Sequence, residues 1–436
     1  MSHMIPIARR RDARIVQLAL LFLTLGLHST QSIAQVNYSV HFEMEKTRYL
    51  LGEPIFCRFV IRNVGNTVFS FRYRTPTRSL ASDYDQEPRF IVSDASGKRL
   101  ADPAPRPCGS PQGTAVYGFV TLPPGQIHTE RWLLNQWAEF AAAGEYRVRA
   151  ERRLALFQSI PQTGKEKPAA FALAIDELTV PVVPATRAQL EAAFQPYLAA
   201  VQNPKDSNPA EAVIVLTSMP QPFFLDQLIA MTNASKPEHL NRRDALDGLA
   251  RLNTPASWKA ILDVFQNNVD AVGAGAKNGA APSEDPLRSY ALLLLAEKAD
   301  PEFIPAFVDT LTKSQEPMRG EVLRALGFFH DTRAYQLLFD NLYSPQARDR
   351  MNAILGLKNA GGKEVTPALL AALDDPEAQV RQVANFALQG MTGHQVTLSA
   401  NPTREESKHV ASEWHTWWRA HAGSFSPPPP AVCHEW

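Results

Sequence analysis

The pattern of hydrophobic and polar positions changes once along the chain, after residues 180–185 (VPVVPA). Before this segment, apolar side chains recur at every second position, as in residues 55–61, where alternate positions are Ile, Cys, Phe and Ile. That period is typical of strands that bury one face. After the segment, apolar residues recur every three or four positions, as in amphipathic helices. The pattern therefore predicts a β domain over residues 36–185 and an α domain over residues 187–421.

The β domain is expected to contain seven to nine short strands, separated by turns that carry Pro or Gly. Short strands at this spacing predict two packed sheets, a β-sandwich. Trp132 and Trp137 are expected to fill its core, and a ligand site built on these aromatic residues is the alternative. The candidate strands are Val36–Met44, Ile55–Ile61, Val68–Tyr73, Arg89–Ser93, Ala115–Thr121, Ile127–Leu134, Glu145–Glu151 and Ala172–Val183.

Residues 140–148 (FAAAGEYRV) resemble the E–F corner of immunoglobulin-like domains, in which a Gly precedes a Tyr. The resemblance implies that the Tyr146 hydroxyl binds backbone upstream of it. Val148 stands where antibody domains carry their second Cys, so the inter-sheet disulfide of those domains is not expected. Residues 49–55 (YLLGEPI) are similar to the opening of immunoglobulin-like modules in bacterial surface proteins. We therefore expect an immunoglobulin-like β-sandwich.

A repeated pattern of arginine and apolar residues runs through the α domain. Small or apolar residues follow each of five anchor arginines at offsets of three, six and seven, which lie on one helix face. The anchors lie 46, 31, 29 and 33 residues apart, and the first interval contains a Gly/Ala-rich segment, residues 267–285, expected to be a flexible insertion. The remaining period of about 30 residues predicts stacked helical pairs, an α-solenoid. The anchors are Arg242, Arg288, Arg319, Arg348 and Arg381.

Residues 374–381 (DDPEAQVR) resemble the signature of HEAT repeats. The short period is similar to that of the HEAT-like units named after phycobilisome lyases, rather than to the longer units of about 40 residues. This resemblance covers residues 236–392, with degenerate helical pairs over residues 186–235. It implies the architecture alone, since no distinct bilin site is evident and solenoids serve many unrelated functions.

The anchor arginines have two interpretations. They form a basic ladder on the concave face that binds an acidic partner, or each packs its stem between repeats and pairs with an acid of a neighbouring unit. We favour the second interpretation, with Asp285, Asp331 and Asp375 as candidate acids.

The α domain ends in a segment rich in tryptophan, with Trp414, Trp417 and Trp418 on one side of a predicted helix. A terminal repeat must cover an otherwise open apolar face, so we interpret these residues as a cap. An aromatic platform for a ligand is the alternative. The proline-rich tail, residues 422–436, is expected to be disordered.

The N-terminal 34 residues have the pattern of a secretory signal peptide. A basic stretch precedes the apolar run Ile15–Leu27, and Ser32 and Ala34 are the small residues that a signal peptidase needs. The apolar run is shorter than the roughly 20 residues that span a bilayer, although a retained signal anchor is the alternative. We therefore expect a periplasmic or secreted protein with no membrane insertion after cleavage.

An oxidising compartment permits disulfides, and Cys57 and Cys108 lie in the same predicted domain. A bridge between them is one interpretation. The other is that Cys57 is a small buried strand residue and Cys108 lies exposed in a loop. Sequence separation cannot decide between them, because a disulfide depends on Cα distance.

Composition and motifs limit the kinds of partner and of chemical site that the sequence leads us to expect. The 436 residues contain 44 basic and 44 acidic side chains, and this balance gives no reason to expect a nucleic-acid partner. The sequence has no HExxH or GxSxG motif, no glycine-rich phosphate loop and no cysteine pair with zinc spacing. We therefore predict no catalytic, cofactor or metal site.

The expected function is that of an exported, non-enzymatic scaffold that binds a protein or peptide through the concave face of the solenoid. An enzyme or carbohydrate-processing accessory protein with a site between the two domains is the alternative. A structural component of the cell envelope is a further alternative.

Overall fold

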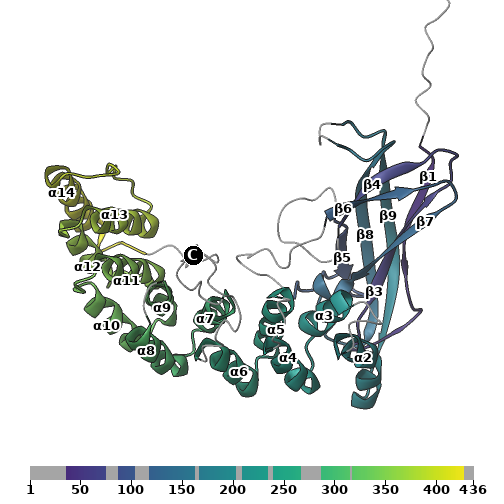
Figure 1. Cartoon of the computed structure of the whole chain (residues 1–436), viewed down its shortest axis with the longest axis horizontal. Helices are drawn as coiled ribbons and strands as arrows, with labels where there is room; N and C mark the ends of the chain where they lie inside the picture. Colours follow the sequence, from purple (N-terminus) through teal and green to yellow (C-terminus); the bar gives the residue numbers. More distant parts are fainter. Residues whose placement is uncertain are drawn as a thin grey trace, which may run out of the picture.

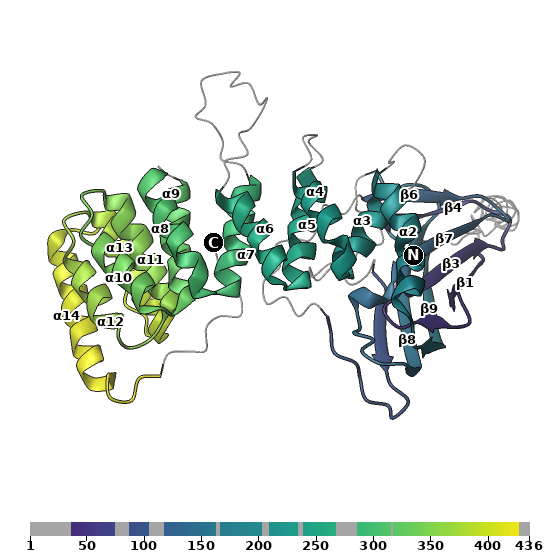
Figure 2. The same ribbon diagram turned by 90° about the horizontal axis from the view of Figure 1, so that it is seen from below.

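The computed structural model describes residues 36–74, 87–103, 117–162, 166–202, 209–233, 239–266, 286–314 and 317–426. The predicted signal peptide, Cys108, the 267–285 insertion and the end of the tail lie outside these residues. In the described chain, a β-sandwich is followed by an arc of helices (Figure 1). Figure 2 shows the sandwich and the last helix, α14 (Arg404–His421), at opposite ends of the molecule.

Two sheets form the sandwich. The first has the order β1-β3-β7 and the second the order β2-β9-β8-β4-β6, with β5 pairing with β8. All pairs are antiparallel except β2 with β9. The strands are β1 (Tyr38–Met44), β2 (Tyr49–Leu50), β3 (Phe56–Asn63), β4 (Phe69–Arg74), β5 (Arg89–Ser93), β6 (Tyr117–Leu122), β7 (Ile127–Leu133), β8 (Gly144–Phe157) and β9 (Ala170–Val183).

Side chains at alternate strand positions fill the space between the sheets. Trp132 is fully buried there, and the half-buried Trp137 packs against it with ring centroids 6.1 Å apart. Cys57 is also fully buried, and burial raises the pKa of its thiol. Cys57 makes no disulfide within the described residues.

The tyrosine corner expected from the sequence is present. The Tyr146 hydroxyl donates a hydrogen bond to the Ala142 carbonyl, with 2.6 Å between the oxygens. The Tyr146 ring also packs edge-on against Phe140. These contacts hold the turn that leads into β8 against the core.

Thirteen α-helices follow among the described residues. In Figure 1, α5, α7, α9, α11 and α13 line the inner side of the arc, and α4, α6, α8, α10 and α12 line the outer side. None of the described helices combines the length and apolar character needed to cross a membrane. Besides α14, they are α2 (Arg187–Gln202), α3 (Pro209–Ser218), α4 (Leu225–Thr232), α5 (His239–Leu252), α6 (Pro255–Gln266), α7 (Pro286–Lys298), α8 (Ile304–Lys313), α9 (Met318–Leu326), α10 (Thr332–Asn341), α11 (Ala347–Ala360), α12 (Thr366–Ala371) and α13 (Ala378–Thr392).

The repeat register differs from the expected one in a single unit. Arg350, rather than Arg348, occupies the anchor position of α11, because Arg350 is buried and Arg348 is exposed. Leu357 is correspondingly fully buried, whereas Leu355 is only partly buried. The period from Arg288 through Arg319 and Arg350 to Arg381 is therefore a constant 31 residues. The apolar pattern alone did not separate these registers, because α11 carries apolar residues at both sets of positions.

Two glycines allow consecutive inner helices to approach closely. A Cβ atom at Gly327 would collide with the carbonyl oxygen of Gly356, and one at Gly356 would collide with the carbonyl oxygen of Leu323. The absence of side chains at these positions lets α9 and α11 pack backbone against backbone.

The helix α14 closes the end of the arc. Trp414 is fully buried and donates from Nε1 to Asn385 Oδ1 on α13 over 2.7 Å. Trp417 is half-buried, and its indole stacks on the rings of His394 and His421, at centroid distances of 5.1 and 4.5 Å. Trp414 therefore acts as the expected cap, while Trp417 forms a partly exposed aromatic stack.

Candidate functional site

The sandwich and the solenoid share a packed junction. Phe56 of β3 and Leu133 of β7 belong to the apolar core of the helices rather than to that of the sandwich. Arg131 on β7 binds Glu45 through two hydrogen bonds of 2.6 and 2.9 Å and also pairs with Glu211 of α3. Because Glu211 lies on a solenoid helix, this ion pair connects the two domains.

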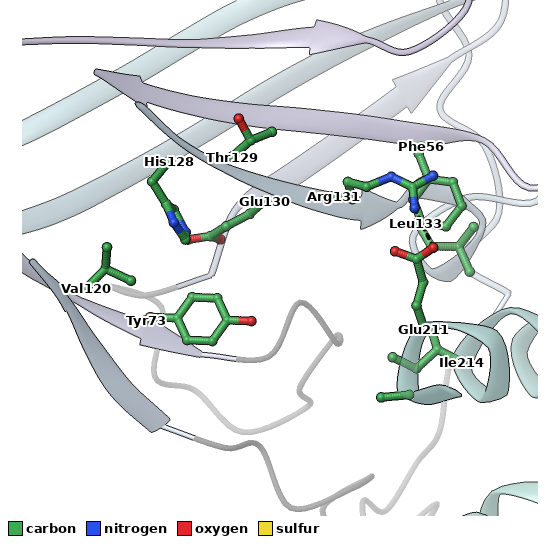
Figure 3. Close-up of a pocket in the computed structure, with 11 residues that line it drawn as sticks. Phe56, Tyr73, Val120, His128, Thr129, Glu130, Arg131, Leu133, Glu211 and Ile214 are labelled. Carbon is green, nitrogen blue, oxygen red and sulfur yellow. Dashed lines mark hydrogen bonds and ion pairs between the residues drawn. The ribbon is translucent and has the colours of Figure 1, made fainter. Parts of the chain in front are cut away.

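A cavity of about 430 Å³ lies at this junction, between β4, β6 and β7 on one side and α3 on the other (Figure 3). Its volume is within the range of small-molecule sites. Tyr73, His128 and Glu130 provide polar groups in its wall, and Arg131 and Glu211 lie at the helical side. Its apolar wall contains Phe56, Val120, Leu133 and Ile214.

A buried ion pair between Glu130 and Arg152 forms the floor of this cavity. Arg152 Nη1 donates to Glu130 Oε2 over 2.6 Å, and the two residues are only 2% and 3% exposed. The guanidinium of Arg152 lies 4.4 Å from the ring centre of Phe59. A buried carboxylate and guanidinium of this kind depend on each other, since losing either partner leaves an uncompensated charge.

The second oxygen of Glu130 faces His128. His128 Nε2 lies 3.4 Å from Glu130 Oε1, and neither atom has another hydrogen-bond partner within the described part of the chain. The His128 side chain is 22% exposed, while that of Glu130 is 1% exposed, so the imidazole covers the carboxylate. Figure 3 shows both side chains on the same side of β7, near the ring of Tyr73.

The surroundings of Glu130 and Tyr73 shift the pKa of each side chain. Burial alone would raise the pKa of Glu130, but the charge of Arg152 and the neighbouring His128 outweigh it and hold this pKa below its ordinary value. Glu130 is therefore a carboxylate at neutral pH. Burial, and secondly the charge of Glu130, raise the pKa of Tyr73, which keeps its phenol proton.

Sequence reasoning missed this constellation, although a signal for it exists. His128, Glu130 and Trp132 alternate on β7, so a carboxylate occupies an inward position next to a core tryptophan. Arg152 likewise occupies an inward position on β8. A charged residue at a buried strand position requires a partner, but only the folded chain brings these two strands together.

The anchor arginines hold successive helical units together. Arg242 Nε donates to the Thr232 carbonyl and Arg288 Nε to the Phe265 carbonyl, each over 2.9 Å. Arg381 donates to three backbone carbonyls, those of Asp375, Pro376 and Pro402. These contacts agree with the structural interpretation of the arginines rather than with a solvent-exposed basic ladder.

Two anchors form ion pairs with the following unit. Arg319 Nε lies 3.0 Å from both carboxylate oxygens of Asp349. Arg350 makes two hydrogen bonds to Asp375, of 2.7 and 2.8 Å. Of the acids named from the sequence, Asp375 thus pairs with an anchor, Asp331 pairs with Arg333, and Asp285 lies outside the described residues.

By helix geometry, a different set of positions, five residues after each anchor, lies on the side of the inner helices away from the core. These positions lie opposite the buried offsets of three, six and seven on the inner helices. Their exposure ranges from that of Asp247, 9% exposed, to that of Phe386, 50% exposed. Lys358 Nζ lies 4.9 Å from the ring centre of Phe386. The five positions are Asp247, Leu293, Arg324, Leu355 and Phe386.

No group of three or more potential metal ligands occurs among the described residues. The candidate sites are therefore two: the junction cavity and the concave face of the solenoid.

Residues 278–358 match the model of the family described as HEAT repeats. This segment includes α7 to α10 and most of α11, so this part of the helical region is similar to HEAT repeats, as the sequence predicts. No curated protein matches the chain.

Several solved structures are similar in part. The complex of CpcE and CpcF of phycocyanin lyase from Nostoc sp. is 17% identical, with 52% of this chain and 84% of that chain covered and a TM-score of 0.25. An engineered protein is 13% identical over 52% of this chain and 69% of its own, also with a TM-score of 0.25. Another engineered protein is 15% identical over 47% of this chain and 91% of its own, with a TM-score of 0.23.

Proposed function

We propose that this chain is an exported scaffold, without enzymatic activity, that binds a protein or peptide on the concave face of its HEAT-like solenoid. Export is supported by the sequence pattern of residues 1–34. Binding is supported by the architecture, because stacked helical pairs present an extended curved surface to a partner.

The observation that carries the proposal is the exposure of Phe386. A phenyl ring that is half exposed on an inner helix has no packing role that requires it there, and Leu355 lies at the equivalent position of the preceding unit. Exposed apolar side chains on a concave surface are typical anchors for a partner. The neighbouring Lys358 adds a positive charge to this part of the face.

The test is photo-crosslinking of the mature protein in extracts of its native envelope. A photoreactive residue at Lys358 should capture a defined partner, and Phe386→Glu should reduce the yield strongly. Leu173→Glu, which changes an exposed apolar residue on the sandwich, is the matched control and should leave the yield unchanged. Equal yields from all three proteins would reject the concave face as the binding surface.

A second candidate function has one observation in its favour. The alternative of an enzyme or carbohydrate-processing accessory protein requires a site between the domains, and the junction cavity lies there with an ionised, buried Glu130 in its wall. Polar groups with perturbed pKa values in a cavity are typical of functional sites. This candidate predicts that a small molecule binds in the cavity.

A further inference from the structure

We propose that the partner on the concave face contributes an acidic segment that also carries apolar side chains. This assignment rests on the proposed function, because it names the chemical class of the partner that the same face binds. It follows from the distribution of charge over α9, α11 and α13, which line the inner side of the arc in Figure 1, and from two apolar side chains among those charges.

The charged residues of the last helical units are unevenly distributed between the inner helices and the rest of each unit. Residues 318–392 contain eight basic and eight acidic side chains, so this part of the chain carries no net charge. Six of the basic residues but only two of the acidic ones lie on α9, α11 and α13. The other six acidic residues lie on the outer side or in connecting segments. The inner helices are therefore positive, and an acidic partner complements them.

Three of these six basic residues have partners within the solenoid. Arg319 pairs with Asp349, Arg350 pairs with Asp375, and the buried Arg381 donates to backbone carbonyls. The remaining charged residues of the three helices form no ion pair within the described part of the chain. Three of them are basic and one is acidic, a surplus of two positive charges: Arg324, Arg348, Lys358 and Glu321.

Two of the basic residues have donors available for a carboxylate. Arg324 Nη1 donates to Asn352 Oδ1 over 2.6 Å, and this is the only hydrogen bond of the Arg324 side chain among the described residues. Its Nη2 is accessible, since it is absent from the buried atoms without a partner. Arg348 is exposed, and its side chain makes no hydrogen bond to another described residue. Hydrogen bonds from arginine to a carboxylate are charge-assisted and strong.

Two apolar side chains lie among these charges. Leu355 and Phe386 occupy equivalent positions of α11 and α13, and neither packs against the apolar core of the described helices. Arg348, Leu355 and Lys358 lie along one side of α11, because their spacings are seven and three residues. Lys358 reaches across to α13, where its Nζ lies 4.9 Å from the Phe386 ring centre and its Cε would be 2.9 Å from a Cβ atom at Gly390. This surface fits a segment in which acidic and apolar residues are interspersed.

Fluorescence anisotropy of labelled peptides with the full chain, at neutral pH and low salt, tests the chemistry. A peptide of repeated Glu-Glu-Leu triplets should bind, and added salt should weaken its binding. A Gln-Gln-Leu peptide should bind at least about tenfold more weakly, and a Lys-Lys-Leu peptide should not bind. A Glu-Glu-Ser peptide should also bind about tenfold more weakly than Glu-Glu-Leu, because it has no apolar side chain to bury.

Three variants test the location. Arg348→Glu changes an exposed residue and should weaken binding of the Glu-Glu-Leu peptide about tenfold or more through like-charge repulsion. Arg147→Glu makes the same change of charge at an exposed position of β8 in the sandwich, and as the matched control it should leave binding unchanged. Phe386→Ser should weaken binding of the Glu-Glu-Leu peptide but not that of the Glu-Glu-Ser peptide.

The failing outcomes are distinct. Equal binding of the Glu-Glu-Leu and Gln-Gln-Leu peptides, weakened by Phe386→Ser, would overturn the acidic assignment and leave the proposed function standing. Binding of none of the peptides would overturn the acidic assignment, and crosslinking from position 358 then decides the proposed function independently. Equal weakening by Arg348→Glu and Arg147→Glu would reveal general attraction to the whole chain and overturn the assignment to this face.

Discussion

Arg152 and Glu130 come from different sheets of the sandwich, and their side chains meet in its core with 2.6 Å between Nη1 and Oε2. The pair therefore joins the two sheets at the floor of the junction cavity. Its burial makes it both a structural element and the source of the ionised carboxylate that the cavity presents.

Removing one member of this pair should be far more damaging than removing both. Glu130→Ala should lower the free energy of unfolding by about 3–5 kcal/mol, because it leaves the guanidinium buried without its carboxylate. The double variant Glu130→Leu with Arg152→Met should cost much less, since no buried charge remains. Urea unfolding of the three proteins measures the difference. A double variant as unstable as the single one would contradict the interaction.

The same carboxylate should give the protein an acid-sensitive stability. The pKa of Glu130 in the folded state lies below its ordinary value of 4.5, so folding favours the ionised form. Its contribution is fully present above that ordinary value and is lost as the pH falls through the folded-state pKa. Melting temperatures measured from neutral to acidic pH should therefore fall less steeply for Glu130→Gln than for the unchanged protein. Parallel curves would show that Glu130 has no lowered pKa.

The tyrosine corner should contribute a single hydrogen bond. Tyr146→Phe removes the hydroxyl that binds the Ala142 carbonyl and should lower the free energy of unfolding by about 1 kcal/mol. Tyr38→Phe removes a hydroxyl that binds the Phe171 carbonyl at a more exposed position, and it serves as the control with a smaller effect. Equal midpoints for Tyr146→Phe and the unchanged protein would refute the role of the corner.

The repeat register can be tested on one helix. Leu357→Ala should cost about 2–5 kcal/mol through lost burial and the cavity left behind. Leu355→Ala, two residues away, should cost clearly less because Leu355 is only partly buried. Thermal or urea unfolding compares the two. A larger loss of stability in Leu355→Ala than in Leu357→Ala would instead support the register anchored at Arg348.

Local patterns in the sequence were sufficient to predict that the first domain is built from strands and the second from helices. The strand period, the Gly-Glu-Tyr corner at Tyr146 and the helical period with its recurrent arginines are all visible within a few residues, because each reflects which side of a strand or helix is buried. The same reasoning identified Trp414 as part of a cap.

Tertiary structure decided what depends on residues far apart in the chain. Whether Arg348 or Arg350 enters the interface between units was settled by the position of Asp375 on the next unit, since both registers of α11 are apolar. The junction cavity combines Glu130 of a strand with Glu211 of a helix. The charge of Glu130 is tolerated in the core because Arg152 of the opposite sheet pairs with it. Periodicity reports which side of an element is buried, but it carries no information about which other element covers that side.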